Sequence, residues 1–144
     1  MAPTTRAAAS AMLFNAWQAL EAGDHATLRV TLPKLTATNL QEQFQLTEKG
    51  DTLLTGACRR GDDEAVALLL RQGTTVDSAP NGIGANALHI ACNLGHTACT
   101  ALLIDSQADV NSAWAEGSGC RPLHFAARQG STECLRLLLA HPDL

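Results

Sequence analysis

Residues 119–130 read Gly-Cys-Arg-Pro-Leu-His-Phe-Ala-Ala-Arg-Gln-Gly, and this stretch decides the fold because two earlier segments repeat it. Residues 84–95 read Gly-Ala-Asn-Ala-Leu-His-Ile-Ala-Cys-Asn-Leu-Gly, and residues 50–61 read Gly-Asp-Thr-Leu-Leu-Thr-Gly-Ala-Cys-Arg-Arg-Gly. The leucine in the fifth position and the closing glycine recur at spacings of 34 and 35 residues. A fixed period of this length predicts an array of structural repeats.

Each copy predicts two helices joined by a turn. A short polar residue or a proline opens the first helix, where it supplies an N-cap acceptor or a preset backbone angle. Leucine and alanine form a narrow apolar stripe, glycine ends the helix, and acidic residues lie where the second helix presents its positive end. The first helices open at Thr52, Asn86 and Pro122, and the alanines of the stripe are Ala57, Ala91 and Ala126. The closing glycines are Gly61, Gly95 and Gly130, and the acidic residues are Asp62, Asp63, Glu64 and Glu133.

The second helix of each copy carries an apolar cluster. The clusters are Val66, Leu68 and Leu69, then Cys99, Leu102 and Leu103, then Leu135, Leu137 and Leu138. A unit of two short helices cannot bury such a face by itself, so neighbouring units must stack on one another. We therefore expect a solenoid in which successive copies share the core.

These features resemble ankyrin repeats. The clearest pieces of that family's pattern are residues 122–127, Pro-Leu-His-Phe-Ala-Ala, and residues 108–111, Ala-Asp-Val-Asn. The resemblance covers about residues 48–144 and implies an all-α ankyrin-repeat solenoid of stacked helix-turn-helix units joined by short β-hairpin-like finger loops.

The resemblance also implies a division of the chain. We expect an N-terminal tail, a degenerate capping helix pair with a long connector, and three ankyrin repeats, the last of them incomplete at its C-terminal finger. The corresponding ranges are 1–10, 11–47, 48–82, 83–117 and 118–144. In the capping pair, Gly23 and Asp24 form the turn, and Leu28, Val30 and Leu32 lie on the second helix.

Three departures from the family pattern carry expectations. Gln107 stands where the family has glycine, so it either adopts a left-handed backbone at a cost of about 1 kcal/mol or ends the helix differently. Arg121 replaces a threonine, so His124 loses the hydroxyl that would orient it. The final helix pair leaves Leu135 and Leu138 uncovered, which suggests further chain or a partner there.

The composition excludes several classes of protein. The 144 residues are 46% hydrophobic and 17% charged, with a net charge of -4 and only two Trp, three Phe and no Tyr, which argues against nucleic-acid binding. The longest apolar run, residues 65–70, is far shorter than the roughly twenty residues of a membrane span.

Cysteine usage and the N-terminus bear on location. Five cysteines without a paired framework suggest reduced thiols in the cytoplasm or nucleus. The first twenty residues contain Arg6 and no acid, so they faintly resemble an organellar transit peptide. The same residues continue into the predicted capping helix, and we therefore treat organellar targeting as the alternative.

The resemblance implies a protein-binding surface and no catalysis. Finger tips and the concave face of the first helices bind other proteins in this family, so we expect a protein partner, no cofactor and no small-molecule substrate. Carried over by position, the partner-binding residues are Asp51, Arg59, Arg60, Asn93, Leu94, Arg128 and Gln129 on the helices and Pro80, Asn81, Ile83, Trp114 and Glu116 on the fingers.

Two of these expectations are specific. Trp114 lies on a small-residue loop, where it either anchors a partner or folds back on the neighbouring finger. Arg59 and Arg128 share a repeat position and suit a carboxylate-bearing partner, unless they are only solvated helix-end charges.

Other chemical interpretations are weaker. Cys92, His96 and Cys99 have ligand-like spacing, but closed zinc sites need four ligands and the repeat pattern explains all three residues, so no metal is expected. His89 and His124 are interpreted as structural. Asn111 resembles the asparagine that oxygen-dependent hydroxylases modify in some ankyrin repeats.

Two functions follow as alternatives. The first is a non-enzymatic adaptor or regulatory scaffold that binds a partner protein through the concave face. The second is a structural subunit permanently embedded in a larger multiprotein assembly. The sequence names neither partner nor pathway.

Overall fold

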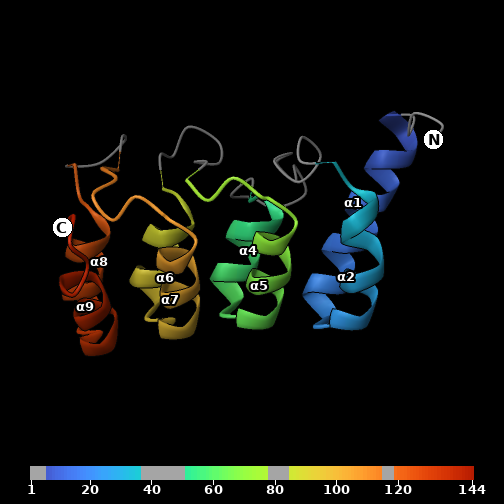
Figure 1. Cartoon of the computed structure of the whole chain (residues 1–144). Coiled ribbons are helices and arrows are strands. Elements are labelled where there is room, and N and C mark those ends of the chain that lie inside the picture. Colours follow the sequence, from blue (N-terminus) through green and yellow to red (C-terminus); the bar gives the residue numbers. More distant parts are fainter. Residues whose placement is uncertain (1–5, 37–50, 78–84, 115–118) are drawn as a thin grey trace.

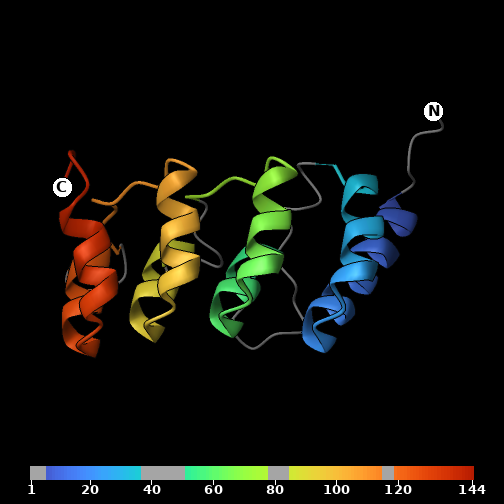
Figure 2. The ribbon, with the colours of Figure 1, turned by 60° about the horizontal axis from the view of Figure 1, so that its bottom comes forward.

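The computed structural model describes residues 6–36, 51–77, 85–114 and 119–144. Within these ranges the chain forms four helix pairs that follow one another along a single row (Figures 1 and 2). The pairs are α1 (Arg6–Ala22) with α2 (His25–Thr31), α4 (Leu53–Arg60) with α5 (Asp63–Arg71), α6 (Ala87–Leu94) with α7 (Thr97–Asp105), and α8 (Pro122–Gln129) with α9 (Thr132–Leu139). A short 3-10 turn, η1 (Leu32–Lys34), follows α2.

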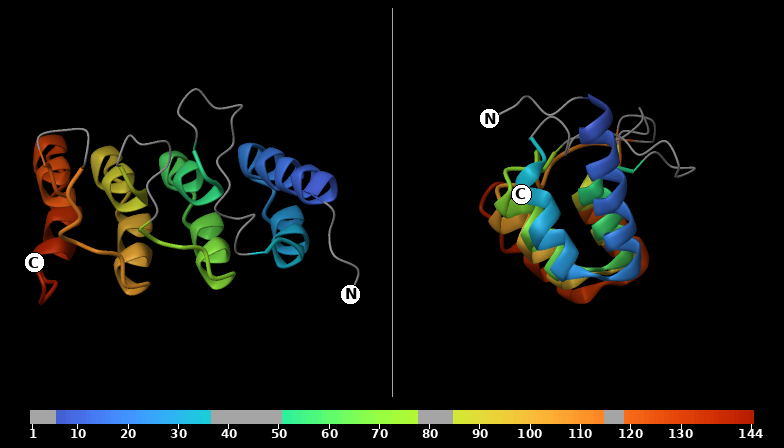
Figure 3. Two further views of the ribbon diagram at one scale, coloured as in Figure 1. Left: turned by 90° about the horizontal axis from the view of Figure 1, so that it is seen from above. Right: turned by 90° about the vertical axis from the view of Figure 1, so that its right-hand side faces the viewer.

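The helices form two layers (Figure 3). The first helices of the pairs, α1, α4, α6 and α8, make one layer, and the second helices, α2, α5, α7 and α9, make the other. Each helix packs against its own partner and against the equivalent helix of the next pair. The predicted all-α solenoid is confirmed.

The core runs through the whole stack, as the repeat pattern predicts. Leu54 and Leu88 are 1% exposed, and Leu123 at the equivalent position of the last pair packs against the same core. The small residues Ala57, Ala91 and Ala126 of the first helices are fully buried. Burial of this kind removes apolar surface from water at about 25 cal/mol per Å², so the stack itself is the main source of stability.

One register in the last pair differs from the prediction. Cys134, four residues after Gly130, is fully buried at the position of Cys99, whereas Leu135 is only half-buried. Leu138 is also fully buried, so the expectation that it lies uncovered is wrong. Cys134 faces the preceding pair, where its Sγ lies 3.6 Å from Thr100 Oγ1, whereas no helix pair in the described residues packs on the other side of α9, toward which Leu135 points. The exposed apolar residue of α9 is Leu139 instead, at 63%.

The capping pair docks through a close helix approach. α1 begins at Arg6, inside the segment predicted as a tail, and Trp17 lies against Gly56 of α4. Leu28 and Val30 lie on α2 as predicted, whereas Leu32 is the first residue of η1; both leucines are buried, and Val30 is 62% exposed. The other predicted segment boundaries, at residues 47/48, 82/83 and 117/118, involve residues that lie outside the described ranges.

The turn after α7 shows how the chain accommodates a missing glycine. Gln107 has φ of 67°, as predicted for a left-handed backbone, and Gly73 at the equivalent position of the preceding pair has φ of 80°. An L side chain in that region costs about 1 kcal/mol.

The described parts of the chain contain no strand, and at the base of one finger the Trp114 amide donates to the Cys120 carbonyl at 2.9 Å. No helix in these parts has the length and apolarity that a membrane crossing requires.

Candidate protein-binding surface

The first helices of the repeats share an outward face near their C-terminal ends. Residues one and two positions before the closing glycine lie there on α4, α6 and α8, and we call this set the first-helix face. It consists of Arg59, Arg60, Asn93, Leu94, Arg128 and Gln129. Arg60, Leu94, Arg128 and Gln129 are exposed, and the other two are half-buried. None of them belongs to the buried apolar core.

The arginine of the first repeat is already neutralised. Arg59 donates from Nε to one carboxylate oxygen of Asp51 at 3.0 Å and from Nη2 to the other at 2.8 Å. Asp51 is 4% exposed, so its predicted place on the partner-binding surface is wrong. The bidentate ion pair draws the carboxylate inward, and it leaves Arg59 little capacity for a partner's charge.

The arginine of the last repeat has a different setting. The guanidinium of Arg128 lies over the Phe125 ring, 5.8 Å from its centroid, and Nη2 donates to the Asn93 amide oxygen at 3.4 Å. Among the described residues Arg128 forms no ion pair. A guanidinium held on an aromatic face keeps most of its N–H donors for another acceptor.

Trp114 leans on the last repeat. Its ring centroid lies 5.6 Å from that of Phe125 at an interplanar angle of 55°, and the residue is half-buried. The indole therefore packs on a residue of α8, an arrangement different from the predicted contact with the neighbouring finger. Phe125 itself was missed by the sequence interpretation. Its signal is that a large aromatic residue stands where the other two repeats have Gly56 and Ile90.

The turn histidines His89 and His124 have structural contacts. The His89 imidazole accepts from the Asn86 amide at Nδ1 (3.3 Å) and donates from Nε2 to the Ser112 carbonyl at 2.9 Å. Burial lowers the pKa of His89, which favours the neutral ring that this pair of bonds needs. His124 does not lose its orientation, because its Nδ1 accepts from the backbone amide of Arg121 at 2.8 Å.

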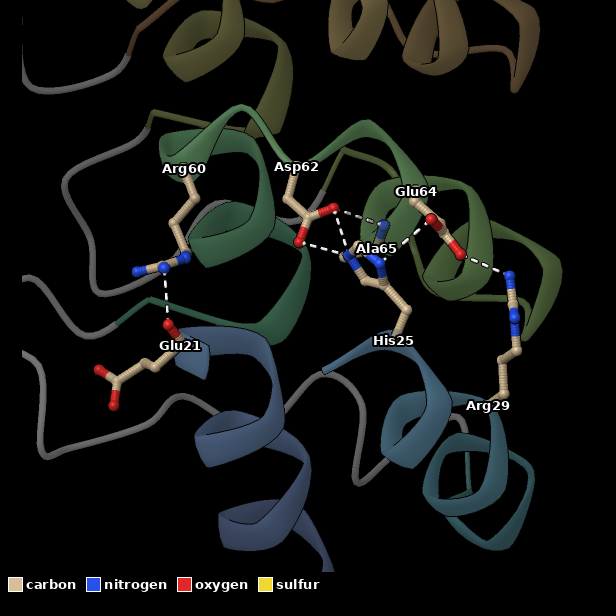
Figure 4. A network of polar contacts seen from close by, with 7 residues as sticks. All are labelled: Glu21, His25, Arg29, Arg60, Asp62, Glu64 and Ala65. Carbon is tan, nitrogen blue, oxygen red and sulfur yellow. Dashed lines mark hydrogen bonds and ion pairs between the residues drawn. The ribbon is translucent and has the colours of Figure 1, made fainter. Parts of the chain in front are cut away.

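Arg60 serves the junction with the capping pair. Its Nη2 donates to the Glu21 carbonyl at 2.7 Å (Figure 4). In the same junction His25 of α2 reaches toward Asp62 and Glu64 of the first repeat. The predicted partner-binding role of Arg60 is thus combined with a structural one. The predicted finger residues Pro80, Asn81, Ile83 and Glu116 lie outside the described residues.

The candidate zinc ligands are committed to packing. Cys92 and Cys99 are buried, and burial raises the pKa of Cys92 to about 12 and that of Cys99 to about 11. The His96 ring covers Gly61, with Cε1 2.7 Å from the place of a Cβ there. The described residues contain no group of three or more His, Cys, Asp or Glu side chains placed to hold a metal ion. Protonated, buried thiols are poor zinc ligands.

Asn111 has both ends of its amide engaged. Its Nδ2 donates to the Asp143 carbonyl at 2.5 Å, and its Oδ1 accepts from Arg121 at 3.3 Å. A hydroxylase would have to release these bonds to reach the side chain. Modification of Asn111 stays a prediction, which intact-protein mass spectrometry tests as the gain of one oxygen atom.

A comparison of the sequence with models of known protein families agrees with the repeat geometry. A family model described as ankyrin repeats in three copies matches residues 16–113 and 79–144. The chain is an ankyrin repeat protein. The match begins inside α1, so the capping pair belongs to the ankyrin array. Ankyrin repeats are in general modules for protein–protein interaction and are typically not enzymes. A search among curated proteins found no significant match.

Proposed function

We propose that this ankyrin repeat protein is a non-enzymatic adaptor or regulatory scaffold that binds a partner protein through the first-helix face. The proposal rests on the observation that each first helix has one side buried in the stack and another side exposed to solvent. One side of α6, for example, buries Leu88 and Ala91, while the other presents Leu94 at 44% exposure. A large apolar side chain in water that does not serve the stack is available for a partner.

A pair of leucines allows a matched test. Leu94 lies on the first-helix face, and Leu139 is the exposed leucine of the second-helix layer on α9. Tagged wild type, Leu94→Asp and Leu139→Asp are purified from the source cell and the bound proteins are compared. The proposal expects Leu94→Asp to lose its specific partner and Leu139→Asp to keep it, with similar melting temperatures. Partners that remain on Leu94→Asp contradict it.

A structural subunit of a larger assembly is the second candidate, favoured by the exposed apolar residues of the second-helix layer. Leu139 is 63% exposed on α9, and Val30 is 62% exposed on α2. In that case the isolated chain aggregates or self-associates, and Leu139→Asp, not Leu94→Asp, releases it from the assembly. A soluble monomer by analytical ultracentrifugation favours the adaptor.

For location we propose the cytoplasm or the nucleus. Free cysteines at all five positions, four of them buried, support a reducing compartment. Fluorescence microscopy of a C-terminally tagged chain tests this, and import into an organelle with loss of the N-terminal segment contradicts it.

A further inference from the structure

Two arginines at one repeat position have different surroundings, and the difference defines a site. Arg59 lies eight residues after Asp51, which supplies its carboxylate. Arg128 lies eight residues after Cys120, so the last repeat has a thiol where the first has an acid. The first repeat therefore shows that a guanidinium at this repeat position binds a carboxylate. The last repeat has no carboxylate at the position of Asp51.

The surroundings of Arg128 hold its head group in place. The Phe125 ring lies beneath the guanidinium at 5.8 Å, and the Trp114 ring lies beside Phe125 at 5.6 Å. Asn93, the residue of the middle repeat in the same position, provides one acceptor at 3.4 Å. A fork of donors held against an aromatic face loses less freedom on binding a carboxylate than a solvated arginine does.

Resting on the proposed function, we propose that Arg128, Phe125 and Trp114 form a subsite for an acidic side chain of the partner protein. The carboxylate of an aspartate or glutamate takes the place at Arg128 that Asp51 takes at Arg59. The apolar atoms next to it in the partner segment pack on the two aromatic rings.

The local positive charge of Arg128 favours this occupant over a neutral or basic one. Arg128 has no ion pair within the described part of the chain, so no described carboxylate competes with one from a partner. The whole chain carries a net charge of -4, so at long range it does not attract an acidic protein. Recognition therefore depends on the close contact, and we expect the acid to slow dissociation more than it speeds association.

The last repeat offers a substitution that imitates the first. Cys120→Asp places a carboxylate in the position of Asp51 and satisfies Arg128 from within the chain. Ala85→Asp is the matched control, because residue 85 has the same position in the middle repeat, where no arginine follows. Arg128→Gln removes the cation directly, and Arg71→Gln makes the same change of charge at an exposed residue at the end of α5.

The probe is a displayed library of short random peptides selected on the full chain. Selected peptides are synthesised with their Asp and Glu residues intact or exchanged for Asn and Gln, and dissociation constants are measured on each variant. We expect the exchange to weaken binding to the wild type, Ala85→Asp and Arg71→Gln by about tenfold, as for a lost charge-assisted contact. On Arg128→Gln and Cys120→Asp the exchange has little effect.

The outcomes separate the two proposals. Selected peptides without acids, or an acid exchange that costs Arg128→Gln as much as the wild type, overturn the carboxylate subsite. If such peptides still lose affinity for Leu94→Asp, the first-helix face remains the binding surface. Peptides that bind Leu94→Asp and Arg128→Gln as tightly as the wild type overturn both.

Discussion

The indole ring of Trp17 in α1 lies directly on the bare backbone of Gly56 in α4. Its Cη2 and Cζ3 atoms are 2.8 and 2.9 Å from the place where a Cβ of residue 56 would stand. Glycine inside a helix normally costs about 1 kcal/mol relative to alanine. Here the missing Cβ makes room for a large side chain, so α4 gives up helix propensity in order to seat the capping pair.

We therefore expect Gly56→Ala to destabilise the protein although it improves helix propensity. The added methyl group overpacks the contact with Trp17 by about 1–3 kcal/mol, which urea denaturation followed by tryptophan fluorescence measures. The control is the same substitution in a Trp17→Leu background, where the clash is gone and alanine becomes neutral or stabilising. A loss of equal size in both backgrounds would assign the effect to something other than the ring.

Gln107→Gly is expected to stabilise the protein. Residue 107 has φ of 67°, and glycine removes about 1 kcal/mol of left-handed strain, which raises the melting temperature by about 2–4 °C. Gly73→Gln is the reverse control, since φ there is 80° and no atom lies within 4 Å of the added Cβ. It should lower the melting temperature by strain alone. A fall in the melting temperature of Gln107→Gly is the contrary result.

Docking of the capping pair is expected to weaken as pH rises. The hydrogen bond to Asp62 raises the pKa of His25 above its ordinary 6.5, with further contributions from the charges of Asp62 and Glu64, against burial and Arg29. Nε2 of the ring is 2.8 Å from Asp62 and Nδ1 is 3.1 Å from Glu64, so only the protonated ring donates to both (Figure 4). This stability is complete below pH 6.5 and is lost as pH rises through the raised folded pKa.

Free energies of unfolding, measured across this pH range, test the predicted loss of stability. The advantage of wild type over His25→Gln should be a few tenths to about 1 kcal/mol at low pH, because the contact is partly exposed, and should shrink at high pH. Asp62→Asn is the control, since an amide oxygen can still accept from the Ala65 amide at the start of α5, now at 3.0 Å. That variant should flatten the pH dependence. A stability advantage of the wild type over His25→Gln that grows with pH would contradict the prediction.

Thiol reactivity should single out Cys120. The other four cysteines are at most 1% exposed, and burial raises the pKa of three of them: Cys58, Cys92 and Cys99. Because thiolates are the reactive form, an alkylating reagent should modify one thiol quickly in the native protein and five after denaturation. Cys120→Ser should remove the fast phase. Rapid modification of two or more thiols would show that the stack opens.

Much of the fold could be predicted from residues 50–61, 84–95 and 119–130, because helix caps and turn glycines act over a few neighbouring positions. The N-cap bond from the His89 amide to Asn86 was predicted, and the left-handed backbone at Gln107 is one of the two alternatives that the sequence left open. The interpretation failed where a one-residue shift decides which side chain of α9 packs against the preceding pair. Leu135 was placed in the core position that Cys134 occupies, since an apolar run alone does not specify the face of a short helix.

The sequence by itself determined the repeat, its two-helix unit and the need for stacking, because periodicity and turn chemistry are local properties of the chain. Only the tertiary structure decided which charges remain available to a partner. Asp51 and Arg59 are eight residues apart and both looked exposed, yet their ion pair removes one of them from the surface. Among the described residues, Phe125, Trp114 and Asn93, which only folding brings together, surround Arg128 and none of them neutralises its charge.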